Sequence, residues 1–326
     1  MVKLDGLKFA TFTAVVCSVF ALTTTNVWSQ WEPSKEVELI AHVKTSSSTY
    51  AFASAVFNEI KAQDLLKKGV KLRSVRGARG GKARKYVGIT KKGDPHVLQV
   101  LTPSQINNPI LSQSDVDLRL FKPVAIMVIT PLTLAVPVNS PYKSMQDIID
   151  DIKARPGKVI HGGGAFGNVA SLVGELWARE AGVKMPYAAF EKQGMLELLG
   201  GHIAFGMHNP AQVNQYVKAG KLKLIAASQK LGNYPEVKTF KESGFNFKYL
   251  RQYRGWWMSK DVSDDTVKYY TDLMTKVRNG KGFKDYISKN NLTSTWIVGA
   301  ELDKMLKDEY ANYLKLDTEL GLIKKK

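Results

Sequence analysis

The sequence is poor in cysteine and lacks the signatures of common catalytic centres. Its 326 residues include one cysteine, Cys17, which excludes a disulfide scaffold and a structural zinc site built on two or four cysteines. It has no Gly-x-Ser-x-Gly elbow, no His-Glu-x-x-His helix and no P-loop. His202 and His208 lie close in sequence without a carboxylate beside them. We therefore predict no metal site.

Acidic residues are missing from one long segment. The chain carries 47 Lys and Arg against 29 Asp and Glu, a net charge of +18. Nucleic-acid binding, a basic surface that attracts anions or partners, and a plain solvated face are the three interpretations of the segment 67–92. Single-strand binders stack bases on aromatic rings, and this segment offers one ring, Tyr86, so we predict no nucleic-acid partner. Its eleven basic residues are Lys67, Lys68, Lys71, Arg73, Arg76, Arg79, Lys82, Arg84, Lys85, Lys91 and Lys92.

The first residues have the order of a secretory signal peptide. Lys3 and Lys8 precede an apolar run that begins at Phe9. The run is about 14 residues long, short of the roughly 20 that a membrane span needs. A lipoprotein is disfavoured because Val16 precedes Cys17 where a small residue is wanted. We predict that residues 1–29 are removed and that the remainder is a soluble periplasmic protein without cysteine.

The remainder alternates between strand and helix patterns. An apolar segment at 37–43 is followed by a hydroxyl-rich loop and by Phe52, Val56 and Ile60 at helical spacing. Ser144 with Asp147 forms a capping box, and Asn209-Pro210 and Ser263 are further helix starts. After about residue 250 the pattern is mostly helical, with a final helix at 300–318. Strands alternating with helices predict an α/β fold with parallel sheets. Further strands are expected at 70–75, 96–101, 124–129, 132–136, 158–161, 202–207 and 222–227.

A glycine-rich loop follows the expected strand at 158–161. Gly162, Gly164 and Gly167 have the spacing of a dinucleotide fingerprint. However, Tyr187 stands about 20 positions on, where that fingerprint requires an acidic residue. We therefore predict no dinucleotide. The loop still suits an anion, because glycines allow close approach and the amides at a helix start are free to donate.

Taken in order, these segments resemble the extracytoplasmic receptors of the tripartite tricarboxylate transporter family, also called Bug receptors. The resemblance covers nearly all of residues 31–323. The segments that carry it are His42–Tyr50, Arg76–Gly81, Asn108–Leu111, Gly162–Asn168, Gly174-Glu175, Leu198–Ile203, Ala219–Leu222, Arg254–Trp256, Glu309-Tyr310 and Leu320–Leu322.

The resemblance implies a type II periplasmic-binding-protein fold, with two α/β lobes, a central ligand cleft and two crossovers. Lobe I would hold residues 30–131 and 252–326, and lobe II residues 132–251. The family binds small carboxylates and delivers them to a membrane permease, without catalysis or a cofactor, and we expect a monomer. Two alternatives stay open, an exported ligand sensor that docks on a membrane sensor protein and an exported enzyme.

The expected ligand-binding residues lie in loops at the ends of strands. Lys44 stands where the family has proline and Tyr50 where it has aspartate, so this ligand can differ from those of other members. We predict an anionic ligand, with a di- or tricarboxylate and an aromatic carboxylate both open. The predicted site comprises Lys44, Ser46, Ser47, Ser48, Thr49, Tyr50, Thr102, Ser104, Gln105 and Arg254 from lobe I, and Gly163, Gly164, Asn168, Ser171, His208 and Asn209 from lobe II.

Overall fold

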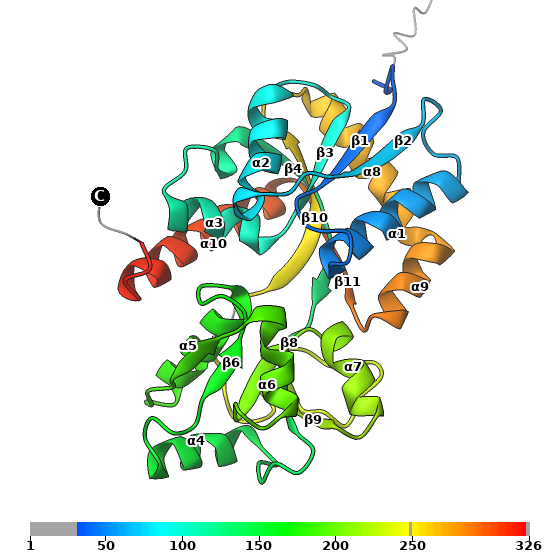
Figure 1. The fold of residues 1–326 in the computed structure, drawn as a ribbon. Coiled ribbons are helices and arrows are strands. Elements are labelled where there is room, and N and C mark those ends of the chain that lie inside the picture. Colours follow the sequence, from blue (N-terminus) through cyan, green and yellow to red (C-terminus); the bar gives the residue numbers. More distant parts are fainter. Residues whose placement is uncertain (1–30, 248–249, 324–326) are drawn as a thin grey trace, which may run out of the picture. The chain divides into compact units, whose positions relative to one another are not determined.

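The computed structural model describes residues 31–247 and 250–323, with the side chain of Lys192 left out. The predicted signal peptide lies outside these residues. The described chain forms two β-sheets with helices on both faces of each. The chain leaves the first sheet after residue 130 and re-enters it at residue 252 (Figure 1), so it crosses between the sheets twice.

The first sheet has six strands in the order β11-β4-β10-β3-β1-β2. β1 pairs in parallel with β2 and β3, whereas β10 runs antiparallel between β3 and β4. This sheet is therefore mixed. Its strands are β1 (Val37–Ala41), β2 (Val70–Ser74), β3 (Val97–Leu101), β4 (Phe121–Thr130), β10 (Gln252–Ser259) and β11 (Thr293–Ile297).

Alternation along the strands, interrupted by bulges in β4, builds one core on each face of the sheet. Leu39 packs on one face and Ile40 on the other, and Trp256 and Trp257 divide in the same way. Figure 1 shows the helices that cover the two faces. One face is covered by α1 (Ser48–Ala62), α8 (Asp264–Asn279) and α9 (Lys281–Lys289), and the other by α2 (Gly81–Lys85), the π-helix η2 (Tyr86–Thr90), α3 (Pro103–Ser112) and α10 (Gly299–Glu319).

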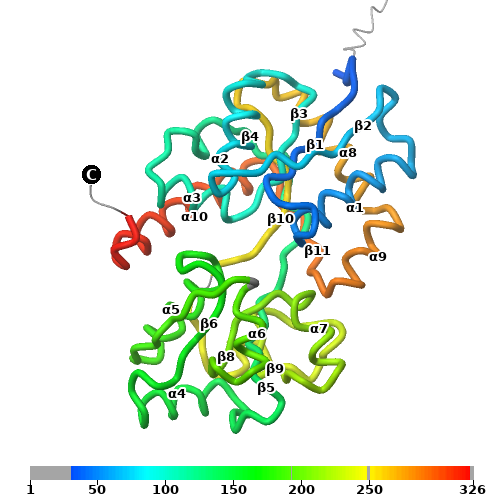
Figure 2. Tube along the Cα trace, viewed as in Figure 1, coloured from blue at the N-terminus to red at the C-terminus, as the bar shows by residue number. Residues whose placement is uncertain are grey.

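The second sheet has five strands in the order β7-β6-β8-β5-β9. Leu134 packs on the face of α4 and α5, and Ala135 on the face of α6 and α7 (Figure 2). The strands are β5 (Thr133–Pro137), β6 (His161–Gly163), β7 (Tyr187–Ala189), β8 (Phe205–His208) and β9 (Leu222–Ala227), and the helices α4 (Met145–Ala154), α5 (Val169–Glu180), α6 (Met195–Leu199) and α7 (Pro210–Lys218).

Most local predictions are confirmed, and two are wrong. The capping box of Ser144 with Asp147 is present, and Ser263 caps α8. The region after residue 250 is mostly helical as expected, and it also contains β10 and β11, which we did not predict. The sheets are mixed rather than parallel, because β5 also pairs antiparallel with β8 and β9. β6 begins at His161 and includes Gly162 and Gly163 of the expected loop, because it pairs with β7 and β8 there.

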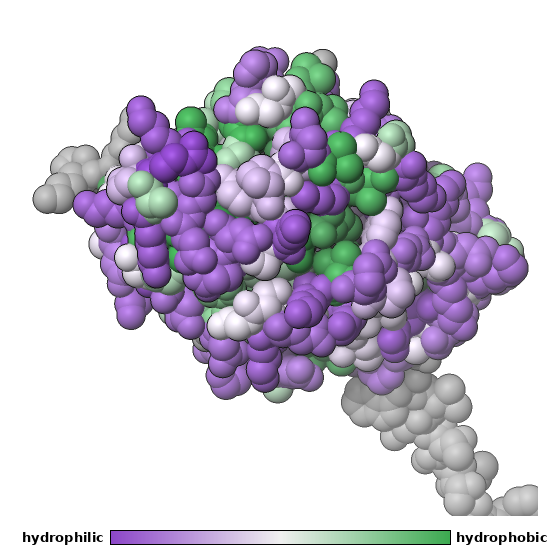
Figure 3. All heavy atoms as spheres, turned by 90° about the horizontal axis from the view of Figure 1, so that it is seen from below, coloured by the Kyte–Doolittle hydropathy of each residue, from purple (hydrophilic) through white to green (hydrophobic). Residues whose placement is uncertain are grey.

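The face seen in Figure 3 is mostly hydrophilic, with apolar residues gathered in a few places. Among residues 31–247 and 250–323, no helix combines the length and apolar character that crossing a bilayer requires.

Two polar contacts join α3 and α10, which flank the first sheet, to the part of the chain that carries α5. The Asn107 side-chain amide donates to the Gly167 carbonyl oxygen at 2.9 Å. Arg179 on α5 forms an ion pair with Glu319 at the end of α10, with Nη1 and Oε2 2.7 Å apart. The two sheets are thus linked by side chains as well as by the crossing strands.

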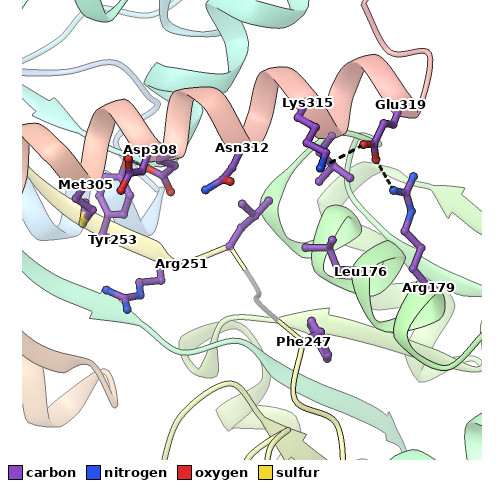
Figure 4. A pocket seen from close by; sticks show the side chains of 13 residues that line it. Leu176, Arg179, Phe247, Arg251, Tyr253, Met305, Asp308, Asn312, Lys315 and Glu319 are labelled. Atoms are coloured by element: carbon purple, nitrogen blue, oxygen red, sulfur yellow. Dashed lines mark hydrogen bonds and ion pairs between the residues drawn. The ribbon is translucent and has the colours of Figure 1, made fainter.

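Two buried carboxyl groups lie on α10. Glu309 accepts a hydrogen bond from the Tyr253 hydroxyl, and both residues line a cavity of about 610 Å³. Figure 4 shows Tyr253 and other residues of this cavity. Burial raises the pKa of Glu309 to about 8. Asp317, also on α10, is fully buried, and burial raises its pKa to about 7. Both carboxyl groups therefore hold protons at a pH at which exposed carboxyls have lost theirs.

The Glu309 carboxyl makes stability depend on pH. Between its ordinary pKa of 4.5 and about 8, the folded chain keeps a proton that the unfolded chain releases. The free energy of unfolding then falls as pH rises, by about 1.4 kcal/mol per pH unit for this proton. We expect Glu309→Gln to remove this contribution, so that its stability relative to the wild type improves steadily with pH. Urea unfolding at several pH values measures the free energy of unfolding of each variant. Glu301→Gln, an exposed change on the same helix, is the control. Parallel pH dependences of stability for E309Q and the wild type would contradict the assignment.

Gly255 is required where β10 crosses β4. A Cβ at this position would collide with the carbonyl oxygen of Ala125, and backbone cannot rotate away as a side chain can. We expect Gly255→Ala to lower the free energy of unfolding by about 2–3 kcal/mol. Gly232→Ala is the matched control, because no atom lies within 4 Å of its Cβ position. Equal urea midpoints for the two variants would show that the strands can separate here at little cost.

Candidate functional site

A cavity of about 1130 Å³ is lined by residues from the first sheet and its helices and from the second sheet and its helices. Four helices begin at it: α1, α3, α5 and α7 each contribute residues of their first turn or their N-cap. The first-turn amides of a helix have no partner within the helix and carry partial positive charge. Four such ends at one cavity favour an anionic occupant.

The first two helix starts follow strands of the first sheet. Ser47 is the N-cap of α1, and its hydroxyl accepts from the Tyr50 amide at 3.1 Å. Thr102 is the N-cap of α3, and its hydroxyl lies 2.9 Å from that of Ser104. Because β1 and β3 run parallel and side by side, their loops leave the same edge of the sheet. The sequence places a hydroxyl-bearing cap at each strand end, which is typical of a ligand site in α/β folds.

The other two helix starts follow strands of the second sheet. Asn168 caps α5, and its side-chain oxygen accepts from the Ser171 amide at 2.9 Å. Asn209 is the N-cap of α7, and its backbone amide donates to the Gln212 side-chain oxygen at 2.9 Å. β6 and β8 are parallel neighbours, so these caps also share an edge. The capping residues satisfy some first-turn amides and leave the ends facing the cavity polar and weakly positive.

Arg254 is the charged group most deeply placed in this cavity. It is 5% exposed and donates to the hydroxyls of Thr130 and Ser48, the latter at 2.9 Å. Its Nε has no hydrogen-bond partner among the described residues. No carboxylate pairs with it in residues 31–247 and 250–323. Burial lowers the pKa of Arg254, which means that the protein alone does not compensate its charge.

A β-bulge lies opposite this side chain. The pairing register between β10 and β4 shifts between Arg254 and Gly255, where β4 carries one extra residue, Met127. The cavity also contains Lys44, which is exposed, and Glu191, the one carboxylate among the described lining residues. The lining therefore carries two cations and one anion, with the buried charge positive.

The structure brings ten of the sixteen predicted site residues to the cavity and leaves six elsewhere. Whether the ten bind a ligand stays a prediction. Those at the cavity are Lys44, Ser46, Ser47, Ser48, Thr49, Thr102, Ser104, Asn168, Asn209 and Arg254. Those that do not line it are Tyr50, Gln105, Gly163, Gly164, Ser171 and His208.

Tyr50 and His208 do not line the cavity. Tyr50 lies in the first turn of α1 and lines a separate groove between α1 and α9. The His208 ring packs over Gly206, two residues back on the same side of β8. Burial lowers the pKa of His208 to about 4, so the ring is neutral. We predicted a ligand contact for each side chain, and neither lies at the cavity where ten of the predicted residues gather.

Two of the other predicted residues, Gln105 and Ser171, form hydrogen bonds within the protein next to the cavity loops. Gln105 is fully buried and accepts from Arg84 at 3.2 Å and from Gln99 at 3.0 Å. The Ser171 hydroxyl accepts from the Gly167 amide at 3.0 Å and donates to the Asn168 carbonyl oxygen at 2.9 Å. Their roles are structural.

The glycine-rich loop is closed off by neighbouring side chains. Tyr187 lies against Gly163 and donates to the Gly164 carbonyl oxygen at 2.7 Å, and burial raises its pKa to about 12. The Gln193 side chain covers Gly164. Glu191 and Gln193 therefore line the cavity where we expected the glycine amides.

Several lining residues were missed by the sequence reasoning. Glu191 and Gln193 follow β7, which runs parallel to β6, so the rule that ligands gather at strand ends could have found them. Asn290 follows α9, and no local signal indicates it. The lining residues with polar side chains outside the prediction are Thr45, Glu191, Gln193, Gln212, Gln252, Tyr253 and Asn290. In the part of the chain that the structure describes, no group of His, Cys, Asp and Glu could hold a metal ion.

Comparison with known proteins places this architecture among transport receptors. The model of the tripartite tricarboxylate transporter family receptor matches residues 94–322. A UPF0065 protein from the gbd 5' region of Cupriavidus necator is 26% identical over 195 residues, 59% of each chain. The protein BugT of Bordetella pertussis is 29% identical over 127 residues, 38% of this chain and 39% of that one. The match thus spans well under two thirds of either curated relative.

Solved structures share the fold at low identity. A TctC solute-binding protein from Polaromonas, without ligand, superposes with a TM-score of 0.75 at 21% identity, over 88% of this chain and 99% of that one. MatC from Rhodopseudomonas palustris with bound malate gives 0.69 at 16% identity, over 87% and 99%. Another Rhodopseudomonas palustris protein, with adipate, gives 0.71 at 18% identity, over 89% and 98%.

These likenesses confirm the predicted α/β fold of two lobes found in periplasmic binding proteins. The family model matches well over half of the chain, across strands and helices of both sheets. The chain belongs to the tripartite tricarboxylate transporter receptor family.

Proposed function

We propose that this protein is an extracytoplasmic receptor that binds a small aliphatic dicarboxylate between its lobes and delivers it unchanged to a membrane permease. Lobe I would comprise residues 30–131 and 252–326, and lobe II residues 132–251. Membership of the two sheets supports this division. The predicted signal peptide supports delivery to the periplasm, where such a receptor would act as a monomer.

The observation that carries this proposal is the uncompensated charge of Arg254. Placing a cation in a protein interior costs on the order of several kcal/mol unless an anion or several hydrogen bonds offset this cost. Among the described residues, Arg254 has two hydroxyl partners, and its Nε has none. A ligand carboxylate in the cavity would supply the missing negative charge.

Two anionic ends match the arrangement of helix starts. α1 and α3 face the cavity from one sheet, and α5 and α7 from the other. A hydrogen bond to a charged oxygen contributes about 1.5–3 kcal/mol, and a micromolar complex needs about 8 kcal/mol. A dicarboxylate that reaches both lobes makes enough such bonds and favours the closed arrangement, because only closed lobes satisfy both ends. The malate and adipate held by two relatives of the same fold are dicarboxylates.

An aromatic carboxylate is less well supported. That alternative depended on Tyr50, which lines a different groove. Tyr253 is the one aromatic residue among the described lining residues, and its hydroxyl is bound to Glu309. The lining thus offers hydroxyl and amide groups in place of a stacking surface.

Arg254→Gln should separate ligand binding from folding. We expect the variant to bind malate or adipate about 10- to 150-fold more weakly, the loss that one charged hydrogen bond represents. Without ligand, R254Q should be at least as stable as the wild type, because a buried cation without a counter-ion is costly. Titration calorimetry measures the first effect and urea unfolding the second.

Arg155→Gln is the matched control, since it removes one exposed arginine from the end of α4, outside the cavity. It should leave the dissociation constant unchanged. Unaltered dicarboxylate binding by R254Q would overturn the assignment of Arg254, and a preference of the wild type for neutral or cationic ligands would overturn the proposed function.

Glu191 tests the sign of the ligand charge. Its carboxylate lines the cavity and is exposed, so it should repel a dianion through a screened interaction. We expect Glu191→Gln to tighten dicarboxylate binding a few-fold at low ionic strength and less at high ionic strength. Glu197→Gln, outside the cavity, is the control. Weaker binding by E191Q would instead indicate a ligand that donates a hydrogen bond or carries an ammonium group.

A further inference from the structure

The helical segment at 81–90 has two sides of opposite character. Ala83 and Val87 are fully buried in the core. The other side exposes Lys82, Lys85 and Ile89, which share one face by their spacing of three and four residues. Further exposed cations come before this segment in the sequence, at Arg76 and Arg79, and after it, at Lys92. We call the set Arg76, Arg79, Lys82, Lys85, Ile89 and Lys92 the basic face.

We propose that the basic face binds the surface of a membrane that contains anionic phospholipids, and so holds lobe I against the bilayer. This interaction is separate from the ligand cavity, because no residue of the basic face lines that cavity. It gives a role to a charge concentration that ligand binding does not use.

Ion pairing neutralises some of the basic residues of 67–92. Lys71 and Arg73 pair with Glu38, Lys67 pairs with Asp64, and Lys91 pairs with Asp94. None of the five cations of the basic face has an ion pair within residues 31–247 and 250–323. The basic face therefore keeps its positive charge.

The fold holds the start of the basic face in an unusual conformation. Ala78 and Arg79 both have positive φ, 48° and 50°, a region that side-chain-bearing residues rarely adopt. The Arg79 carbonyl oxygen accepts from the Asn108 side chain at 2.8 Å, which fixes the turn. The Arg79 side chain stays exposed.

The composition of the face favours lipid over protein or nucleic acid. Lysine is depleted at protein–protein interfaces, whose binding energy is concentrated in aromatic and arginine anchors. Single-stranded nucleic acid needs free rings, and the Tyr86 ring is engaged by Arg73, with its hydroxyl bound to Glu38 at 2.8 Å. Ile89, 48% exposed among the lysines, can enter the interfacial region of a bilayer while the cations attract lipid phosphates.

Vesicle binding of the full chain tests the proposal. Each basic residue near an anionic surface is worth about five-fold in partitioning, so the triple change Lys82→Glu, Lys85→Glu and Lys92→Glu should weaken binding at least about 100-fold. We expect the wild type to sediment with phosphatidylglycerol vesicles and not with phosphatidylcholine vesicles, and less at high ionic strength. Ile89→Gln should weaken binding a few-fold.

The control variant changes Lys184, Lys218 and Lys221 to glutamate. These lysines lie within residues 132–251, are exposed, and have no ion pair among the described residues. It alters net charge equally and should retain vesicle binding. Because residues 1–30 are common to all variants, they cannot account for a difference between them.

Equal loss by both triple variants would show that net charge alone acts and would overturn the proposal. So would absence of binding to phosphatidylglycerol, or binding of duplex DNA or polyglutamate in place of vesicles. Dicarboxylate titration of the basic-face variant should match the wild type, which confirms that the variant is folded and keeps this test separate from that of the proposed function.

Discussion

A buried cation with no carboxylate partner among residues 31–247 and 250–323 is the constraint on which the cavity depends. Arg254 is reached by hydroxyls from two other elements, Thr130 at the end of β4 and Ser48 at the start of α1. It thus connects the point where the chain leaves the first sheet with the first helix that faces the cavity. The next residue, Gly255, lies so close to β4 that only glycine fits there. An anion would complete this arrangement rather than disturb it.

The elements that could be predicted are those encoded by neighbouring residues. Helix starts are examples, because each depends on residues no more than three positions apart. They are marked by Ser144 with Asp147, Asn168, Asn209 with Pro210, and Ser263. β10 was missed because its Trp256 and Trp257 pack on opposite faces of a covered sheet. A strand buried on both sides loses the polar and apolar alternation that identifies strands. Its partners β3 and β4 lie more than a hundred residues away, so no local pattern reports the antiparallel pairing.

The same distinction applies to the site. Sequence reasoning located the strand ends and helix starts, and ten predicted residues lie at the cavity. It could not assign which side of an element a residue faces: Tyr50 turns to α9, and His208 turns over Gly206. Nor could it tell that Tyr187 and Gln193 would cover the glycine loop, since each approaches from another strand or turn. Tertiary packing decides which side of a helix or strand faces the cavity, and a single sequence gives little information about that packing.

Negative charge is kept away from Arg254 on both sides of β10. Tyr253, its neighbour in the strand, faces α10 and donates a hydrogen bond to Glu309. Burial keeps the Glu309 carboxyl protonated at neutral pH. On the cavity side, Glu191 is exposed and belongs to a turn after β7 in the second sheet. A carboxylate built permanently beside Arg254 would satisfy the cation and remove the reason to bind an anion. The protein instead pairs Arg254 with neutral hydroxyls, and this leaves its charge for a molecule that arrives from solution.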